Sequence, residues 1–414
     1  MAKNDNLTDF LTDVANAIRE KKGTNKPINP QDFSSEIASI QTGGGTDKLQ
    51  WRCDNVKSLA NEFEGYTGTD YSILDGVDTS KVKSFSRMFF GNTNMTTLPE
   101  LDYSGLQDTY TDMNDMCGGG CKYLKNAVIT LKVPTNMNSV FDSQSYTVFT
   151  NLTLTINNTN YITSLNNSFN YSRIDAINET NTLDLINCLR LDYAFHHCKF
   201  YGNNKTLTLL NTQNVQQWGN AFNYSNIENI SELDFAGALP SNYHNSVFYY
   251  CNHLKEIHIK NTSNIKNFPQ SFQGCAVAKT IETVDMLNMT NITSLFTGCA
   301  KLENLTLKNI KVNLQIGSGT SWGHLLTNES LLNTAKELWD NTNNALGGAR
   351  TLTMSTTSKT NIQSIYVKLI TPTAEQEAED PYINNKKPCV ECESTDEGAM
   401  TLEEYIISKG WSIA

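Results

Sequence analysis

The chain has 414 residues, a formal net charge of −11, 39% hydrophobic residues and 18% charged residues. This length and apolar content can bury a substantial core, whereas the acidic balance argues against a nucleic-acid-binding surface, which needs clustered Lys and Arg. The sequence has no long apolar run, so we expect no membrane span, and its first residues predict no secretory signal peptide.

Residues 1–42 predict a helical hairpin. Apolar residues recur at helical spacing from Leu7 to Ile18, and a second apolar stripe follows Pro30. Two helices this short cannot bury both stripes alone, so we expect the hairpin to attach the protein to another chain or to its own copies. The expected interface residues are Leu7, Phe10, Leu11, Val14, Ile18, Phe33, Ile37 and Ile40.

Residues 43–80 predict a linker and an N-terminal cap. Gly43, Gly44 and Gly45 form a flexible joint. The residues after it lack the repeat described below, as expected at the end of a repeat array. An alternative to attachment is that the hairpin folds back onto this cap and covers Trp51 and Leu59.

One phrase recurs between residues 81 and 309: an aromatic residue, a Cys or Ser three positions later, and then alternating apolar residues. The register also runs back, less cleanly, through Phe141, Met116 and Phe89, which gives nine units at 24 to 28 residues. A fixed period in this range predicts a solenoid. We expect the aromatic rings to stack in the core and the cysteines to be small, buried, unpaired thiols. These repeat-core residues are Phe169, Phe195, Phe222, Phe248, Phe272, Phe296, Cys198, Cys251, Cys275 and Cys299.

The apolar residues after each aromatic predict a strand. Leu254, Ile257 and Ile259 have the Leu-x-x-Leu-x-Leu spacing that opens the strand of a leucine-rich repeat. Stacking such units predicts an α/β solenoid with one parallel sheet. Residues 310–414 then predict a C-terminal cap, with strands at Thr351–Met354 and near residue 411, and an acidic insertion at 371–399.

Candidate chemistry is sparse, and we expect no catalytic, cofactor or metal site. Cys389 and Cys392 form half of a zinc motif without a second half. His196 and His197 precede Cys198, but His197, His253 and His258 lie at different repeat phases, so these histidines are not expected to converge on a metal ion. No nucleophile elbow, phosphate-binding loop or dinucleotide fingerprint is present in the sequence.

The segment Phe296-Thr-Gly-Cys-Ala-Lys-Leu-Glu-Asn-Leu-Thr-Leu307 resembles the BspA-type leucine-rich repeat family, and 78–89 is similar to a variant of that repeat. Residues 9–37 look like the N-terminal segment of many phage and prophage virion proteins, and 408–413 are similar to the end of many phage repeat proteins. The resemblance implies a virion structural protein of a tailed bacteriophage: a fibre, tail or head appendage.

The resemblance to virion proteins also implies which partners the protein has. We expect other virion proteins (capsid, portal or tail) as partners, a host surface glycan or protein as a further one, and homo-oligomers on a virion assembled in the host bacterial cytoplasm. Two alternatives stay open. One is a cell-surface adhesin of a bacterium or protist. The other is a polysaccharide-binding or polysaccharide-cleaving spike, in which exposed Tyr171, Tyr224, Tyr249 and Tyr250 would stack on sugars.

Overall fold

The structure is a computed structural model that describes residues 7–22, 25–38, 56–143, 151–203, 205–240 and 244–316, with short stretches at 322–327, 330, 333–334, 337–338, 350–354, 406–407 and 411–413. The chain divides into two compact units, Met1–Asn204 and Lys205–Ala414. The predictions for the side chains of Leu7, Ile40, Trp51, Cys389 and Cys392, for Gly43–Gly45 and for the acidic insertion fall outside the described residues.

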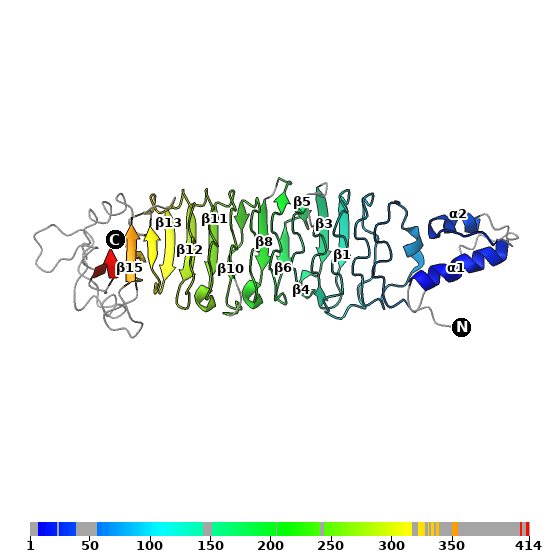
Figure 1. Ribbon diagram of the computed structural model, residues 1–414, viewed down its shortest axis with the longest axis horizontal. Helices are drawn as coiled ribbons and strands as arrows, with labels where there is room; N and C mark the ends of the chain where they lie inside the picture. The colour runs from blue at the N-terminus through cyan, green and yellow to red at the C-terminus, as the bar shows by residue number, and fades with distance from the viewer. Residues whose placement is uncertain are drawn as a thin grey trace, which may run out of the picture. The chain divides into compact units, whose positions relative to one another are not determined.

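Short elements dominate both units (Figure 1). The first unit contains α1 (Leu7–Lys22), η1 (Pro30–Asp32), α2 (Phe33–Ala38), η2 (Ser72–Gly76), β1 (Asn126–Thr130), β2 (Thr135–Asn136), β3 (Leu152–Asn157), η3 (Thr159–Tyr161), β4 (Ile162–Ser164), β5 (Arg173–Ile177), β6 (Thr182–Asp184) and β7 (Lys199–Phe200). The second contains β8 (Thr206–Leu210), η4 (Thr212–Asn214), β9 (Asn229–Ile230), β10 (Leu233–Asp234), β11 (Glu256–Lys260), η5 (Thr262–Asn264), β12 (Thr280–Asp285), β13 (Asn304–Lys308), β14 (Leu314–Ile316), β15 (Arg350–Met354) and β16 (Trp411–Ile413).

The predicted N-terminal hairpin is confirmed. Helix α1 and the shorter α2 share a small core made by Val14, Ala15, Ile18 and Phe33. The sequence favours this arrangement because Pro30 opens the second helical segment, where its fixed φ suits the first turn.

Parallel strand pairs build one side of the repeat region, as the alternating apolar residues predict. In the first unit the order is β1-β3-β5-β7, and in the second β10-β11-β12-β13. Leu152, Leu154 and Ile156 of β3 are buried while the residues between them face outward. The predicted solenoid with parallel strands is therefore confirmed. The α/β part of the prediction is not, because the described repeat is a β-solenoid with few helices, and its strands form several short sheets instead of one.

The aromatic turns on the other side of each coil form a second ladder. The N–H of Phe248 donates to the Ser271 carbonyl at 2.8 Å, and the N–H of Phe272 donates to the Leu295 carbonyl at 3.0 Å. In these turns the residue two positions before the aromatic has a positive φ, as in Ser246. This ladder satisfies backbone groups that the strands do not reach.

The predicted core aromatics are buried, which confirms that part of the repeat assignment. Phe248 lies between Phe222 and Phe272, with ring centroids 5.3 and 5.8 Å away and planes within 12° of parallel. In the first unit Phe169 is stacked in the same way between Phe141 and Phe195. The stacked rings form the central column of the core in each unit.

The start of the repeat differs from the prediction in two ways. In other coils the N–H of the aromatic residue donates to the carbonyl of the residue just before the next aromatic. The N–H of Phe89 donates to the Met116 carbonyl, so Cys117, and not Met116, occupies the aromatic position of its coil. In addition, Phe63 stacks on Phe89 at 5.8 Å, and its N–H donates to the Met88 carbonyl. The predicted cap therefore contains a coil of the same ladder, which the spacing pattern missed because Tyr66, and not Cys or Ser, stands three positions after Phe63.

Two kinds of corner follow the strands, and they occur in successive coils. One kind carries a Thr that opens a 3-10 turn, as in η4 and η5, and the next carries an Asp. The N–H of Asp234 donates to Thr212 Oγ1 at 2.8 Å, and the N–H of Asp285 donates to Thr262 Oγ1 at 2.7 Å. In the second unit the structural repeat at this corner is therefore two coils, twice the period of the aromatic phrase. In the first unit the pairs Thr79 with Asp102 and Thr159 with Asp184 are separated by one additional coil.

The C-terminal residues that the structure describes also pair in parallel. Strand β15 lies between β14 and β16, which confirms the strands predicted at Thr351–Met354 and near residue 411. Trp322 continues the ring column, with its centroid 4.9 Å from that of Phe296.

Candidate functional surfaces

The cysteines at the shared repeat position are buried, as predicted, and the structure adds a reason for the choice of residue. Cys251, Cys275 and Cys299 each donate an S–H···O bond to the carbonyl of the aromatic residue one coil earlier, at 2.9 to 3.2 Å. Ser172 makes the same bond to Phe141. The position thus selects a small side chain that is also a donor, and Cys and Ser share this property.

Burial keeps these thiols in the donor form. It raises the pKa of the Cys299 thiol to about 12. The thiolate, which is the nucleophile and metal ligand, is therefore disfavoured at this position. The cysteine column is part of the scaffold, and the absence of cross-links between its members stays a prediction.

Replacing Cys251 with serine should preserve the bond to the Phe222 carbonyl, whereas alanine should remove it. We expect the alanine variant to lose about 1 kcal/mol more of the free energy of unfolding than the serine variant, the usual net value of one hydrogen bond. Urea denaturation of the two purified variants measures the difference. A serine variant that is less stable than the alanine variant would contradict the donor role.

The apolar residues assigned to attachment are largely occupied within the hairpin itself. Val14, Ile18 and Phe33 are 2 to 5% exposed, and Phe10, Leu11 and Ile37 pack against them partly buried. Ile73 of η2 also packs on this core, and Thr8 Oγ1 donates to Glu62 Oε2 at 2.9 Å. The sequence-based premise that the stripes lack an intramolecular partner is therefore wrong for these buried residues, because the facing helix and η2 cover them.

Aromatic side chains also line the outer edge of the turns. In the second unit Tyr224 and Tyr250 stack with centroids 5.1 Å apart and planes 7° from parallel. A Cβ added to Gly274 would lie 2.9 Å from the Tyr250 ring, so the glycine backbone lies against the other face of that ring. The two faces of Tyr250 are thus used by neighbouring coils, which argues against sugar stacking on this residue.

In the first unit Tyr171 and His197 stack in the same positions, 4.5 Å apart. A hydrogen-bonded row runs beside them: Asn170 Nδ2 donates to Asp142 Oδ1 at 3.2 Å, and His196 Nδ1 lies 2.8 Å from Asn170 Oδ1. Burial lowers the pKa of His196 to about 4. Both histidines lie on this edge of the unit because they are neighbours in the sequence.

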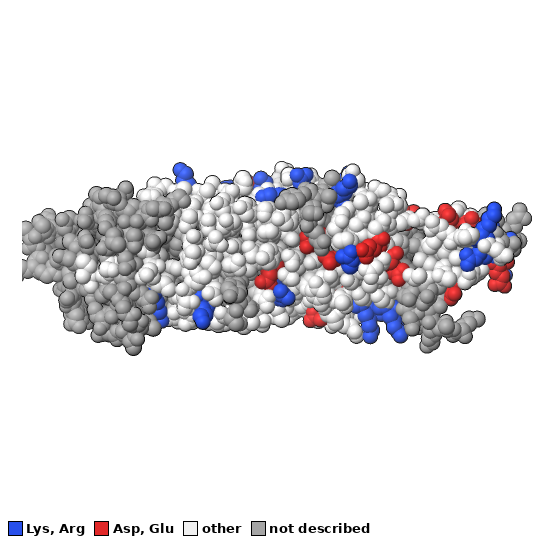
Figure 2. Space-filling model, viewed as in Figure 1, with Lys and Arg blue, Asp and Glu red and all other residues white. Residues whose placement is uncertain are grey.

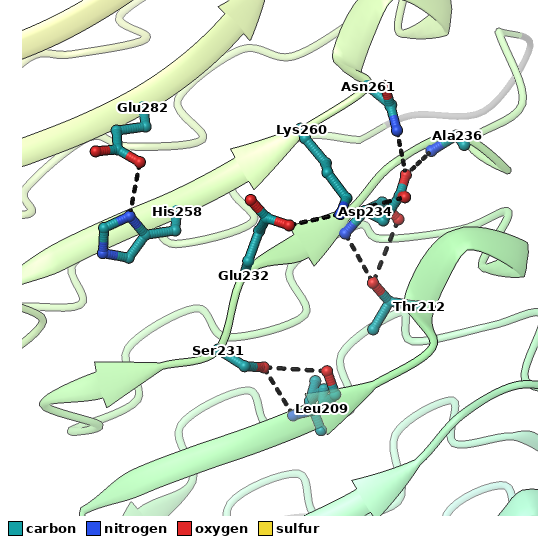
Figure 3. Close-up of polar contacts among 10 residues, drawn as sticks. All are labelled: Leu209, Thr212, Ser231, Glu232, Asp234, Ala236, His258, Lys260, Asn261 and Glu282. Carbon is teal, nitrogen blue, oxygen red and sulfur yellow. Dashed lines mark hydrogen bonds and ion pairs between the residues drawn. The ribbon is translucent and has the colours of Figure 1, made fainter.

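The sheet face of the second unit carries charges that pair between coils (Figure 3). His258 Nδ1 lies 2.9 Å from Glu282 Oε2, and Lys260 Nζ lies 2.6 Å from Glu232 Oε1. At the adjacent corner, Asn261 Nδ2 donates to Asp234 Oδ1 at 2.9 Å. Such exposed pairs contribute little to stability, so this row mainly determines the polar pattern that the face presents.

Figure 2 shows Lys and Arg interspersed with Asp and Glu on one face, separated by wide uncharged areas. The described residues of that face therefore present a mixed and mostly neutral polar surface. This agrees with the low fraction of charged residues in the sequence.

His258 should titrate above the ordinary histidine value. Its hydrogen bond to Glu282 raises the pKa, and Glu256 adds to the effect. Because the folded-state pKa is raised, the stabilisation is complete below the unfolded pKa of about 6.5 and is lost as pH rises through the folded value. Proton NMR titration measures this pKa, and Glu282→Gln should lower it. An unchanged pKa in that variant would show that Glu282 is not the cause.

Within the described residues, no group of three or more metal-ligating side chains is present, and no helix is long and apolar enough to cross a membrane. The structure thus presents repeating rows of side chains on the sheet face and on the turn edge.

A family model described as "Mycoplasma protein of unknown function, DUF285" matches residues 32–128 and 242–364, more than half of the chain. The chain belongs to this family. The two DUF285 matches extend over the coils around Phe89 and those around Phe248, Phe272 and Phe296. No curated protein and no solved structure matches the chain.

Proposed function

We propose that this DUF285 protein is a non-enzymatic structural protein of a bacteriophage virion. Its N-terminal hairpin attaches it to the particle, and its solenoid contacts the host surface or neighbouring virion proteins. The observation that carries the proposal is the coil stack, in which equivalent positions recur at the spacing of adjacent parallel strands, about 4.8 Å. Such a surface is a regular array and suits an extended partner.

The repeat chemistry supports a BspA-type leucine-rich repeat as the unit of this stack. In the Phe-x-Gly-Cys phrase, Phe272 fills the core column, Gly274 adopts a φ of 78°, and Cys275 donates to the Phe248 carbonyl. Each residue type of the phrase therefore has a physical role. The same phrase recurs at Phe296, where Gly298 has a φ of 85°.

The hairpin supports the attachment role because it has its own small core. Glu36 pairs with Lys22 across the two helices, so the hairpin makes polar as well as apolar contacts between its own helices. A module with its own core can keep its shape while its remaining exposed surface binds a neighbour. Attachment would then use that exposed surface and the residues that precede and follow the described part of the hairpin.

A second candidate is a cell-surface adhesin of a bacterium or protist, for which the repeating surface of the coils would also be suited. A sugar-cleaving spike has less support, because the Tyr250 ring is sandwiched within the stack.

Labelling of intact particles tests the proposal. An antibody raised against the purified solenoid, used with gold-labelled electron microscopy, should mark a fixed place on virions from an infected culture. Labelling of bacterial surfaces without particles would favour the adhesin. As a second measurement, added solenoid should reduce the rate of phage adsorption if it contacts the host, and should leave that rate unchanged if its partners are virion proteins.

A further inference from the structure

The strands β5 and β7 place two cations side by side on the outward face of the first unit. Arg173 and Lys199 are partners in the parallel register, so their backbones lie about 4.8 Å apart. The residues that follow them, Ile174 and Phe200, are buried in the core. Two like charges at this spacing repel each other, so the pair favours an anion that lies between them.

Arg173 differs from two other arginines of the same unit in its partners. Arg87 pairs with Glu64 at 2.6 Å, and Arg190 pairs with Asp192 at 3.3 Å. Among the described residues, no group accepts a hydrogen bond from the guanidinium of Arg173. Its planar group can therefore offer two parallel N–H donors to a carboxylate from another molecule, the pairing for which arginine is suited.

An exposed aromatic ring lies against the same guanidinium. The Cζ atom of Arg173 is 4.9 Å from the centroid of the Tyr201 ring, and Tyr201 is 46% exposed. The next residue, Gly202, lies close to the preceding coil, because a Cβ added to it would be 2.2 Å from the Asp175 carbonyl oxygen. The exposed part of the Tyr201 ring offers an apolar surface next to a cation, and the C–H face of a sugar ring can pack on such a surface.

A second pair of rings borders the cations. Tyr171 and His197, which stack on each other, stand two residues before Arg173 and Lys199 respectively. Burial lowers the pKa of His197, and the charge of Lys199 adds to this effect, so the ammonium group lies near that ring. Two neighbouring coils thus present an aromatic pair, a cationic pair and the further ring of Tyr201 next to one another.

We propose that the patch made by Arg173, Lys199 and Tyr201 binds an acidic sugar of a host surface polysaccharide. The carboxylate of a uronic or sialic acid unit lies between the two cations, with Arg173 as its bidentate partner, and the sugar ring packs on Tyr201. A peptide carboxylate satisfies the cations but lacks the rigid apolar face that suits the ring. The inference rests on the host-contact part of the proposed function and specifies its ligand.

Calorimetric titration of the full chain with acidic oligosaccharides tests the site. The probes are short oligomers of glucuronate, galacturonate and sialate, each compared with its own methyl ester, which keeps the sugar ring and removes the charge. We expect at least one acid to bind, its ester to bind at least tenfold more weakly, and the binding to weaken as salt is added. A glutamate oligomer should also bind at least tenfold more weakly than that acid.

Substitutions separate the contributions to binding. Arg173→Gln and Tyr201→Ala should each weaken the binding of that acid about tenfold or more, since each removes one half of the contact. Asp175→Asn should strengthen binding, because it removes a negative charge two residues after Arg173 on the same strand. Arg190→Gln is the matched control and should leave the affinity unchanged, because Arg190 is paired with Asp192 outside β5 and β7.

Binding of none of the three acids at millimolar concentration would overturn the proposal, as would equal binding of acids and esters or an unchanged affinity in Arg173→Gln. Glutamate binding as tight as that of the best acid would overturn the assignment to a sugar. Circular dichroism of each variant separates loss of the site from loss of the fold. Because the titration uses purified protein, its failure together with gold-labelled virions would remove the sugar site and leave the virion role in place.

Discussion

Replacing Phe248 with alanine should lower the free energy of unfolding by about 3–5 kcal/mol, the range for truncating a buried aromatic side chain. The ring is fully buried and stacks on Phe222 and Phe272. Its loss leaves a cavity that the two neighbouring coils cannot close, because their separation is set by the backbone ladder. Chemical denaturation of the purified variant, followed by circular dichroism, measures the change.

The control is Tyr250→Ala, two residues away in the same turn. That ring is 36% exposed, so its removal should cost much less than the removal of Phe248. A Phe248 variant that unfolds like the parent chain would refute the core column as the main source of stability. Equal losses in both variants would indicate that the turn backbone, and not the buried ring, is responsible.

Removal of residues 1–42 should abolish incorporation into particles while leaving the solenoid folded. The hairpin has its own core, and its contacts with the following coil include Ile73 on the hairpin core and the bond from Thr8 to Glu62. The truncated chain should therefore melt within a few degrees of the parent. Electrophoresis of purified virions, with the truncated gene in place of the parent, measures incorporation.

The capping alternative predicts the opposite pair of results. If the hairpin protects the first coil, the truncated chain should aggregate or melt much earlier, because Val56 and Leu59 are fully buried in the intact chain. Normal copy number of the truncated protein in particles would exclude the anchor role. The double substitution Glu20→Gln and Lys21→Gln tests the exposed face of α1. It should leave stability unchanged, and a loss of incorporation would place the interface on that face.

The period of the aromatic phrase was sufficient to predict the solenoid, the parallel strands and the buried column. A regular stack converts sequence spacing directly into contact, so Phe222, Phe248 and Phe272 could be aligned without coordinates. The prediction failed in the coils whose sequence departs from the aromatic phrase. Cys117 takes an aromatic position, and Phe63 belongs to a coil without a strand phrase, and only the backbone ladder shows both.

The candidate surfaces were less predictable because they depend on contacts between coils. The row from Asp142 through Asn170 to His196 joins three coils, and each member is an ordinary surface residue in its own segment. The sequence alone suggested that Tyr250 was free to stack on a sugar. Its ring is covered by Tyr224 and Gly274, which lie about 25 positions away on each side. In an alignment of successive coils, these contacting residues occupy the same or neighbouring positions.

The alternation of Thr and Asp corners limits how such a chain can change in length. Asp234 donates its N–H to Thr212 in the coil before it and accepts from Asn261 in the coil after it. Loss of one coil would place two corners of the same kind next to each other. A Thr would then lack its Asp, or two Asp carboxylates would lie in successive turns. Duplication or deletion of about fifty residues in the second unit would preserve the Thr–Asp pairing at its corners. We therefore expect engineered variants that add or remove two coils between Thr212 and Asp285 to fold better than those that add or remove one.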